Sequence, residues 1–207
     1  MRNNTSNTES QILASAEKLF IEKGFKGTST TAIAKDAGCN QALVHYYFRT
    51  KENLFQKVFL GKFKQLFEQI KVPLERETDF FSKLENMVDV YFNFMIQNPK
   101  IPYFIFNELI TNPRRRKQLR ELFMQKPHQD DVYHQFCASV EKAISQGVIR
   151  DIEPLDLLMD VGSLVVFSFL MAPIITDFLD LDQSHLTDFV DHRKREALTL
   201  LFQGLRV

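Results

Sequence analysis

The side chains best suited to form chemical contacts with a ligand lie between positions 41 and 46. Gln41, His45 and Tyr46 bring an amide, an imidazole and a phenol to the outer surface of one short helical segment, while Val44 and Phe48 fall on its apolar side. Side chains of this kind can hydrogen-bond base edges in a DNA groove and contact phosphates. The spacing therefore predicts contact with DNA.

Two short helices joined by a tight turn are expected to position this surface. The first, near residues 30–37, has an apolar face with two small alanines that let a second helix cross closely. Gly38 ends it, because a residue without a Cβ adopts the left-handed conformation at little cost. Asn40 can accept a backbone N–H as the cap of the second helix, near residues 41–47. The pattern predicts a helix-turn-helix.

A family resemblance covers roughly residues 10–56. Its matching elements are Phe25 after Gly24, the string from Thr28 to Gly38, the triplet Tyr46-Tyr47-Phe48, and Lys51 with Leu54. These residues resemble the TetR family of one-component bacterial transcription regulators. The sequence departs from the family pattern at Cys39 (usually valine), Asn40 (often serine) and His45 (often tyrosine).

DNA contacts are expected from this segment. Gln41, in the first turn of the second helix, is the candidate for reading a base, and Lys51, at the start of the next helix, for binding a phosphate. The complete predicted set is Thr28, Thr30, Thr31, Gln41, Ala42, Leu43, His45, Tyr46 and Lys51.

Net charge supports this placement only when the chain is divided. The 207 residues carry 26 basic and 26 acidic side chains. Residues 1–64 hold 10 Lys and Arg against 5 Asp and Glu, a net charge of +5, and residues 65–207 hold 16 against 21, a net charge of −5. The positive part is the one that contains the helix-turn-helix, as attraction to phosphates requires.

The whole chain shows helical periodicity and no strand alternation, so the fold class is all-α, with about nine helices. The first helix is expected to open with a capping box at Thr8 and to close at Gly24. A longer helix begins after Thr50 and is expected to end before Pro73. We predict a DNA-binding domain over residues 1–53 and a ligand-binding and dimerisation domain over residues 54–207.

The second domain is rich in aromatic side chains: the chain has 20 phenylalanines and no tryptophan. Most of them belong in a packed core, but the resemblance implies a ligand cavity among the middle helices. Aromatic rings with scattered polar groups would suit an apolar or aromatic effector. The predicted ligand-binding residues are Tyr91, Met95, Tyr103, Phe104, Asn107 and Phe136.

The last two predicted helices, near 154–179 and 184–204, carry more apolar surface than one core needs. This favours a four-helix bundle between two copies of the chain. The predicted interface residues are Leu164, Phe169, Phe189 and Leu198.

Other functions find little support. The two cysteines, Cys39 and Cys137, have no metal-ligand spacing and are interpreted as free thiols in a reducing cytoplasm, so we expect no metal and no cofactor. Motifs typical of enzymes are absent, and the basic run 114–117 is interpreted as a solvated helix face. The apolar stretch 161–175 is shorter than a membrane span, which favours a buried helix and no membrane.

The sequence thus predicts a cytoplasmic, homodimeric repressor that binds a near-palindromic double-stranded DNA operator and is released by a small-molecule effector. The alternative is an all-helical ligand-binding or small-molecule-modifying protein in which the helix-turn-helix is only structural. A constitutive DNA-binding protein without an effector is a third possibility.

Overall fold

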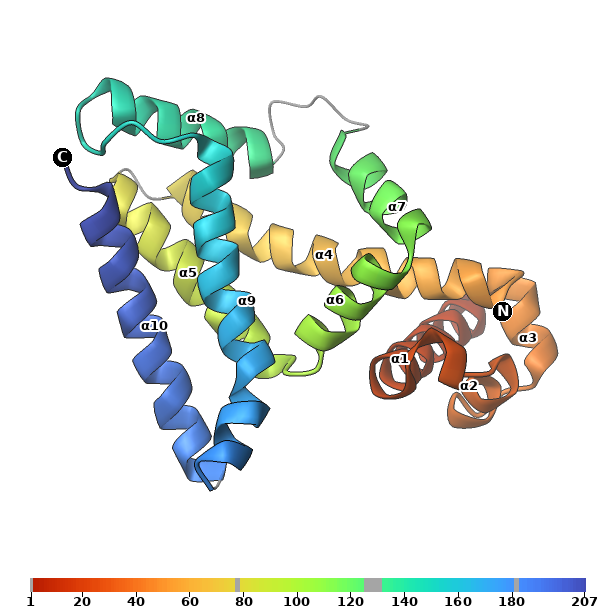
Figure 1. Cartoon of the computed structure of the whole chain (residues 1–207). Helices are drawn as coiled ribbons and strands as arrows, with labels where there is room; N and C mark the ends of the chain where they lie inside the picture. Colours follow the sequence, from red (N-terminus) through yellow and green to blue (C-terminus); the bar gives the residue numbers. More distant parts are fainter. Residues whose placement is uncertain (1, 77–78, 125–131, 181–182) are drawn as a thin grey trace. The chain divides into compact units, whose positions relative to one another are not determined.

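A computed structural model describes residues 2–76, 79–124, 132–180 and 183–207. Every regular element in these ranges is an α-helix, which confirms the predicted all-α class (Figure 1). The helices are α1 (Arg2–Gly27), α2 (Thr30–Asp36), α3 (Gln41–Phe48), α4 (Lys51–Arg76), α5 (Phe80–Gln97), α6 (Ile101–Thr111), α7 (Pro113–Met124), α8 (Val132–Ser145), α9 (Pro154–Phe178) and α10 (Gln183–Leu205).

The chain folds into two compact units. The first unit comprises residues 1–64 and 104–119, and the second comprises residues 65–103 and 120–207. Helices α4, α6 and α7 each begin in one unit and end in the other. The first unit therefore includes more of the chain than the predicted domain over residues 1–53, because α6 and α7 supply side chains to it.

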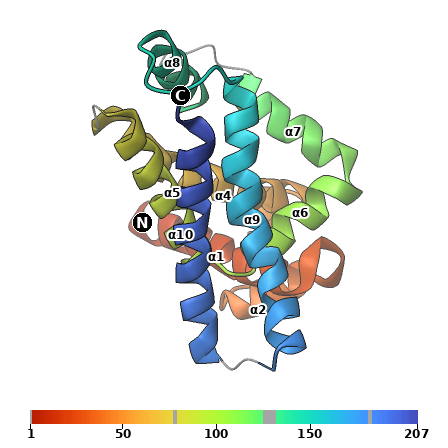
Figure 2. The same ribbon diagram turned by 60° about the vertical axis from the view of Figure 1, so that its left-hand side comes forward.

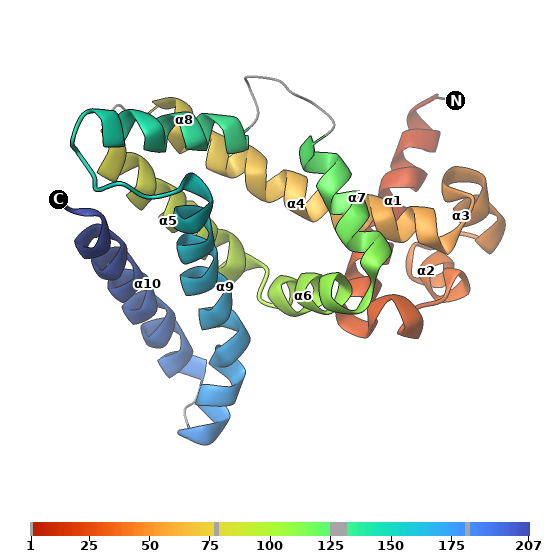
Figure 3. The same cartoon turned by 45° about the horizontal axis from the view of Figure 1, so that its top comes forward.

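The first unit is built around α1. Gly24, with φ of 69°, interrupts the helical geometry of α1 and turns the chain, as the sequence predicts. Phe25 then packs back, with its ring centroid 6.2 Å from that of Phe20 and 5.1 Å from that of Phe55. Helices α1, α2 and α3 lie together in this unit (Figure 3). Phe104 of α6 joins the same core, 5.4 Å from Phe55. Contacts between aromatic rings thus pack α1, α4 and α6 against one another.

The second unit is a set of packed helices in which α5 contacts α8, α9 and α10 (Figure 2). Helices α9 and α10 also pack against each other. Phe92 of α5 and Phe169 of α9 meet with ring centroids 5.9 Å apart, and Phe81 and Phe202 meet at 5.0 Å. These apolar contacts form the core of the second unit.

Two helix boundaries differ from those predicted. Helix α1 begins at Arg2 and not at Thr8, because residues 2–7 contain no proline or glycine to stop it. Helix α4 continues through Pro73 to Arg76. Ile70 and Leu74 are both buried there, and this packing stabilises the turn in which proline removes one backbone hydrogen bond. The helical periodicity also predicts a helix over residues 127–146, and the start of that helix lies outside the described residues.

Helix α9 has 25 residues, more than the apolar stretch that the sequence suggested. In the described part of the chain it is the one helix long and apolar enough to cross a membrane by length and composition, and 28% of its most apolar window is buried. Core and interface helices of soluble proteins pass the same test. Most of this apolar window is therefore at least partly exposed to solvent in the single chain.

Candidate DNA-binding site

Helices α2 and α3 each begin at a side-chain cap. The Ser29 hydroxyl accepts a hydrogen bond from the Ala32 N–H at 3.1 Å, and the Asn40 side chain accepts one from the Leu43 N–H at 2.9 Å. Between the helices Gly38 has φ of 65°, and the Cys39 N–H donates to the Ala34 carbonyl at 2.9 Å. The predicted glycine turn and asparagine cap are both confirmed.

The inner faces of α2 and α3 belong to the core of the first unit. Ile33 and Ala34 of α2 and Val44 and Phe48 of α3 are buried against α1 and α4. Since α3 has only eight residues, burying this side leaves the opposite side for solvent. The tyrosines divide accordingly: Tyr46 is 75% exposed, and Tyr47 packs partly against the core.

The outer side of α3 carries a linked set of polar groups. The Gln41 amide nitrogen donates to the Thr30 hydroxyl at 2.8 Å and lies 3.4 Å from Nε2 of His45. The other ring nitrogen of His45 lies 3.1 Å from the Arg49 carbonyl. Gln41, His45 and Arg49 are all exposed, so these groups can exchange their present partners for a ligand.

Two predicted contact residues require correction. Thr28 is 3% exposed, and its hydroxyl donates to the carbonyls of Leu19 and Gly24, each at 3.0 Å, so its side chain belongs to the fold. Lys51 donates from Nζ to the carbonyls of Phe25 and Thr28 at 2.8 Å and lies 4.2 Å from the centroid of the Phe25 ring. Its ammonium group is engaged inside the unit rather than presented to a phosphate.

The other predicted DNA residues lie on or beside the outer side of the helix-turn-helix. Thr31, Gln41, Ala42, His45 and Tyr46 are exposed, whereas Thr30 and Leu43 are half-buried. Arg49 was missed by sequence reasoning. It ends α3 with φ of 64°, and no pattern in the sequence signals that conformation.

An ion pair joins α1 to the end of α2. Lys18 Nζ lies 2.8 Å from Asp36 Oδ1. The hydrogen bond from Lys18, with a second one from Ser15, lowers the pKa of Asp36, and the same bond raises the pKa of Lys18. The pair therefore keeps both groups charged and steadies the helix on which α3 packs.

The difference in net charge is larger between the two compact units than between residues 1–64 and 65–207. The first unit holds 14 Lys and Arg against 6 Asp and Glu, a net charge of +8, and the second holds 12 against 20, a net charge of −8. Residues 104–119 contribute to this difference because they bring the whole basic run 114–117 into the first unit. A body of this charge attracts a polyanion.

The basic run is not the uniformly solvated face that the sequence suggested. Arg114 is exposed, but Arg115 is fully buried. Arg116 donates to the carbonyls of Leu109 and Ile110 at 2.6 and 3.1 Å and so caps the end of α6. The spacing of four residues between Arg115 and Leu119 was the one available sign that position 115 faces inward.

The predicted ligand-binding residues do not form one group. Phe104 is buried in the core of the first unit, so its assignment to a ligand cavity is corrected. Asn107 also lies in the first unit, beside a hollow of about 390 Å³ lined by Lys23, Gly24, Phe25, Lys26, Asn107, Glu108, Thr111 and Asn112. Tyr91, Met95, Tyr103 and Phe136 lie in the second unit.

Tyr103 has a different environment from the other three residues. Its hydroxyl donates to the Leu170 carbonyl at 2.5 Å and lies 3.4 Å from the Phe169 carbonyl, which has no helical donor because residue 173 is proline. Met95 and Phe136 are buried, and burial raises the pKa of Tyr91 to about 12. A ligand cavity that includes these residues remains a prediction.

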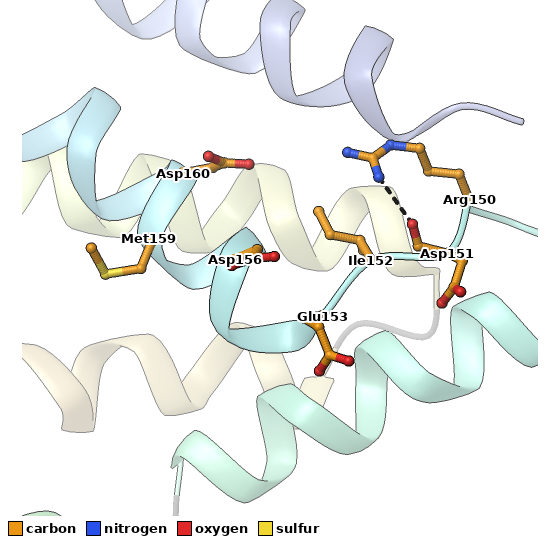
Figure 4. A pocket seen from close by; sticks show the side chains of 7 residues that line it. All are labelled: Arg150, Asp151, Ile152, Glu153, Asp156, Met159 and Asp160. Atoms are coloured by element: carbon orange, nitrogen blue, oxygen red, sulfur yellow. Dashed lines mark hydrogen bonds between the residues drawn. The ribbon is translucent and has the colours of Figure 1, made fainter.

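Other hollows of the second unit lie elsewhere. One of about 550 Å³ lies at the start of α9. It is lined by residues just before the helix and in its first two turns: Arg150, Asp151, Ile152, Glu153, Asp156, Met159 and Asp160 (Figure 4). The Arg150 guanidinium donates to the Asp151 carbonyl there at 2.9 Å. Its acidic groups do not converge: within the described ranges no three His, Cys, Asp or Glu side chains are placed to hold a metal ion.

The predicted dimer residues also separate. Phe169 is 6% exposed and points into the core of the second unit, so its assignment to an interface is corrected. Leu164, Phe189 and Leu198 are half-buried. The large exposed apolar side chains of α9 are instead Leu155, Leu158, Met159, Phe167, Ile174 and Phe178.

Comparison with known proteins identifies the helix-turn-helix. Residues 12–58 match the family model described as bacterial regulatory proteins, tetR family. This part of the chain is a TetR-family helix-turn-helix domain. Helices α2 and α3 thus match the helix-turn-helix of a family described as regulatory proteins.

Two curated relatives show how far the similarity extends. The nucleoid occlusion factor SlmA of Mannheimia succiniciproducens is 27% identical over 102 residues, 49% of this chain and 47% of the relative. The HTH-type transcriptional regulator QacR of Staphylococcus aureus is 30% identical over 103 residues, 47% of this chain and 54% of the relative. The matched part of the chain thus spans about half the length of these relatives.

Structural similarity covers nearly the whole chain. The fatty acid degradation regulator FadR from Bacillus halodurans superimposes with a TM-score of 0.68 over 93% of each chain, at 18% identity. The arrangement of helices beyond residue 58 is therefore similar to that of this solved structure.

Proposed function

We propose that this TetR-family chain is a cytoplasmic repressor that binds a near-palindromic operator as a homodimer and is released by a small apolar effector. The observation that carries the DNA-binding part is the exposed polar side of α3, with Gln41, His45 and Arg49, on a unit of net charge +8. A helix of eight residues reads few base pairs, so two copies are needed for adequate discrimination.

The exposed apolar side of α9 supports the homodimer. Leu155, Met159, Phe167, Ile174 and Phe178 recur at helical spacing, opposite the buried residues of the same helix. A second copy of the helix would cover them, since self-complementary surfaces form two-fold dimers. This arrangement would also leave α9 in protein rather than in a membrane.

The effector is proposed to bind in the second unit, near Tyr91, Met95 and Phe136. These side chains favour an apolar ligand. The name of the Bacillus halodurans structure makes fatty acids and their derivatives the first compounds to test. Because α4 and α6 extend from the second unit into the first, a ligand that shifts either helix could change the presentation of α3.

Selection from a random pool of duplexes with the full-length protein tests the DNA-binding proposal. The expected product is a pair of inverted half-sites, bound by one dimer. A pool without an enriched sequence would instead favour the alternative, in which the helix-turn-helix is structural.

Ligand titration with and without the selected duplex tests the effector. If a fatty acid releases the duplex, the duplex must weaken binding of that fatty acid by the same factor, typically fivefold to about 150-fold. Equal affinities in the two titrations would contradict control by that ligand.

A further inference from the structure

Arg115 of α7 is fully buried in the first unit, although it comes from a part of the chain far from the helix-turn-helix. Its Nη1 atom donates to Glu52 at 2.5 Å and to Gln118 at 3.2 Å, and Nε lies 3.5 Å from Glu108. A buried guanidinium is stable only when its charge is compensated. Glu52, in the first turn of α4, supplies the shortest of these contacts.

Two aromatic rings complete the environment of Arg115. The guanidinium carbon lies 4.1 Å from the centroid of the Phe55 ring and 5.5 Å from that of Phe25. The ammonium group of Lys51 lies 4.2 Å from the centroid of the same Phe25 ring. Two cations from helices far apart in sequence therefore contact one aromatic residue of the last turn of α1.

Hydrogen bonds continue from this cluster to the surface of α3. Lys51, the neighbour of Glu52, donates to the carbonyl of Thr28, which immediately precedes the α2 cap Ser29. On α2 the Thr30 hydroxyl then accepts from Gln41 of α3. Arg115 thus stands at the inner end of a continuous set of contacts that reaches the candidate base-reading side chain.

The pair with Glu52 is the main polar anchor of Arg115. Nε and Nη2 have no hydrogen-bond partner among the groups that the structure describes. Removal of the Glu52 carboxylate would consequently leave the buried guanidinium poorly compensated, while Glu52 itself, with 44% of its side chain exposed, tolerates substitution more easily.

We infer that Arg115 is a positioning residue for DNA binding, which fixes the first turn of α4 and the turn before α2 so that α3 is presented correctly. This inference rests on the DNA-binding function proposed above. It assigns residues 104–119 a part in recognition without any contact to DNA.

The test compares Arg115→Met with Arg114→Met, which removes the same charge from an exposed position of the same helix. Full-length proteins bind the duplex enriched by the wild type and a duplex of random sequence, at matched active concentrations. We expect Arg115→Met to weaken binding to the enriched duplex at least about tenfold and binding to random DNA less than about twofold. Arg114→Met should change both affinities by similar factors, because it removes only charge.

Hydrogen exchange provides a second readout that needs no DNA. Amides of residues 25–31 and 41–48 should exchange faster in Arg115→Met than in Arg114→Met, while those of α9 exchange equally in both. If Arg115→Met does not fold, Glu52→Gln replaces it. Its control is then Glu9→Gln, which removes one carboxylate from the exposed 2.7 Å pair between Glu9 and Lys57 in the same unit.

The outcomes separate the inference from the function on which it rests. Equal exchange in the Arg115 and Arg114 variants, or equal losses of affinity for enriched and random DNA in Arg115→Met, would overturn the positioning role. A wild-type protein that enriches no duplex would contradict the DNA-binding proposal instead, and the exchange comparison would still decide whether Arg115 orders the helix-turn-helix.

Discussion

Lys51 donates a 2.8 Å hydrogen bond from its Nζ atom to the carbonyl oxygen of Thr28, 23 residues earlier in the chain. Lys51 therefore links the start of α4 to the segment just before α2, inside the first unit. A lysine in the first turn of a helix next to a DNA-reading segment could equally have faced a phosphate, and only the structure distinguishes the two roles.

Replacing Lys51 should reveal this internal role. Lys51→Met removes two hydrogen bonds from a charged donor, so the free energy of unfolding should fall by about 1–3 kcal/mol. Affinity for every duplex should fall with it, but the dependence of log affinity on log salt should keep its slope. Urea unfolding and binding at several salt concentrations measure both quantities.

Lys57→Met is the matched control, because Lys57 is an exposed cation of the same helix whose partner is Glu9. It should cost little stability. A Lys51→Met protein of normal stability whose salt slope had fallen by about one would show instead that Lys51 binds a phosphate directly.

Gln41 is expected to read a base. Gln41→Ala should lose about 1–3 kcal/mol of discrimination at one position in each half-site and relax the enriched sequence there. Repeating the selection with the variant measures this effect. Gln11→Ala, at an exposed glutamine of α1, should leave the enriched sequence unchanged. The same consensus from Gln41→Ala as from the wild type would remove Gln41 from the recognition surface.

Two phenylalanines of α9 should respond differently to the same substitution. Phe167 is 61% exposed, so Phe167→Glu should yield folded monomers by placing a charge in the dimer interface. Phe169 is buried against Phe92, so Phe169→Glu should instead destabilise the second unit, by about 3–5 kcal/mol or more. Sedimentation and thermal unfolding separate the two results. A Phe167→Glu protein that stays dimeric would place the interface elsewhere.

The sequence predicted the local features of the first unit well because they depend on neighbouring residues. The Gly38 turn and the Asn40 cap are both encoded within a few positions and were confirmed. The environments of Lys51, Phe104 and Arg115 depend instead on contacts across long sequence separations. Periodicity identifies the buried side of a helix but not its partner, so these three residues were assigned to the wrong surroundings.

The same limit explains the error on α9. This helix is apolar on both sides, so its pattern could not tell the residues facing the core from those left exposed. The sequence therefore placed Phe169 in the interface, whereas the packing of α5 and α10 directs it inward.

Tyr91 should make stability depend on pH in the alkaline range. Burial raises its pKa to about 12, above the value near 10 of an unfolded chain, so the unfolded state releases the proton more readily. The stabilising contribution is complete below pH 10 and is lost as the pH rises toward 12, by about 2–3 kcal/mol in total.

Unfolding by urea at a series of pH values from 9 to about 11.5 measures this loss. Tyr91→Phe should flatten the fall in stability, whereas Tyr46→Phe, at an exposed tyrosine, should leave it as in the wild type. A profile unaffected by Tyr91→Phe would mean that Tyr91 is solvated.

The most direct test of the central claim is equilibrium binding of the full-length protein to the enriched duplex and to a scrambled duplex of the same composition. At physiological salt we expect one dimer per duplex and a preference of at least about a thousandfold for the enriched sequence. That preference should depend on the exposed side of α3. Equal affinity for the two duplexes at every salt concentration would contradict sequence-specific recognition.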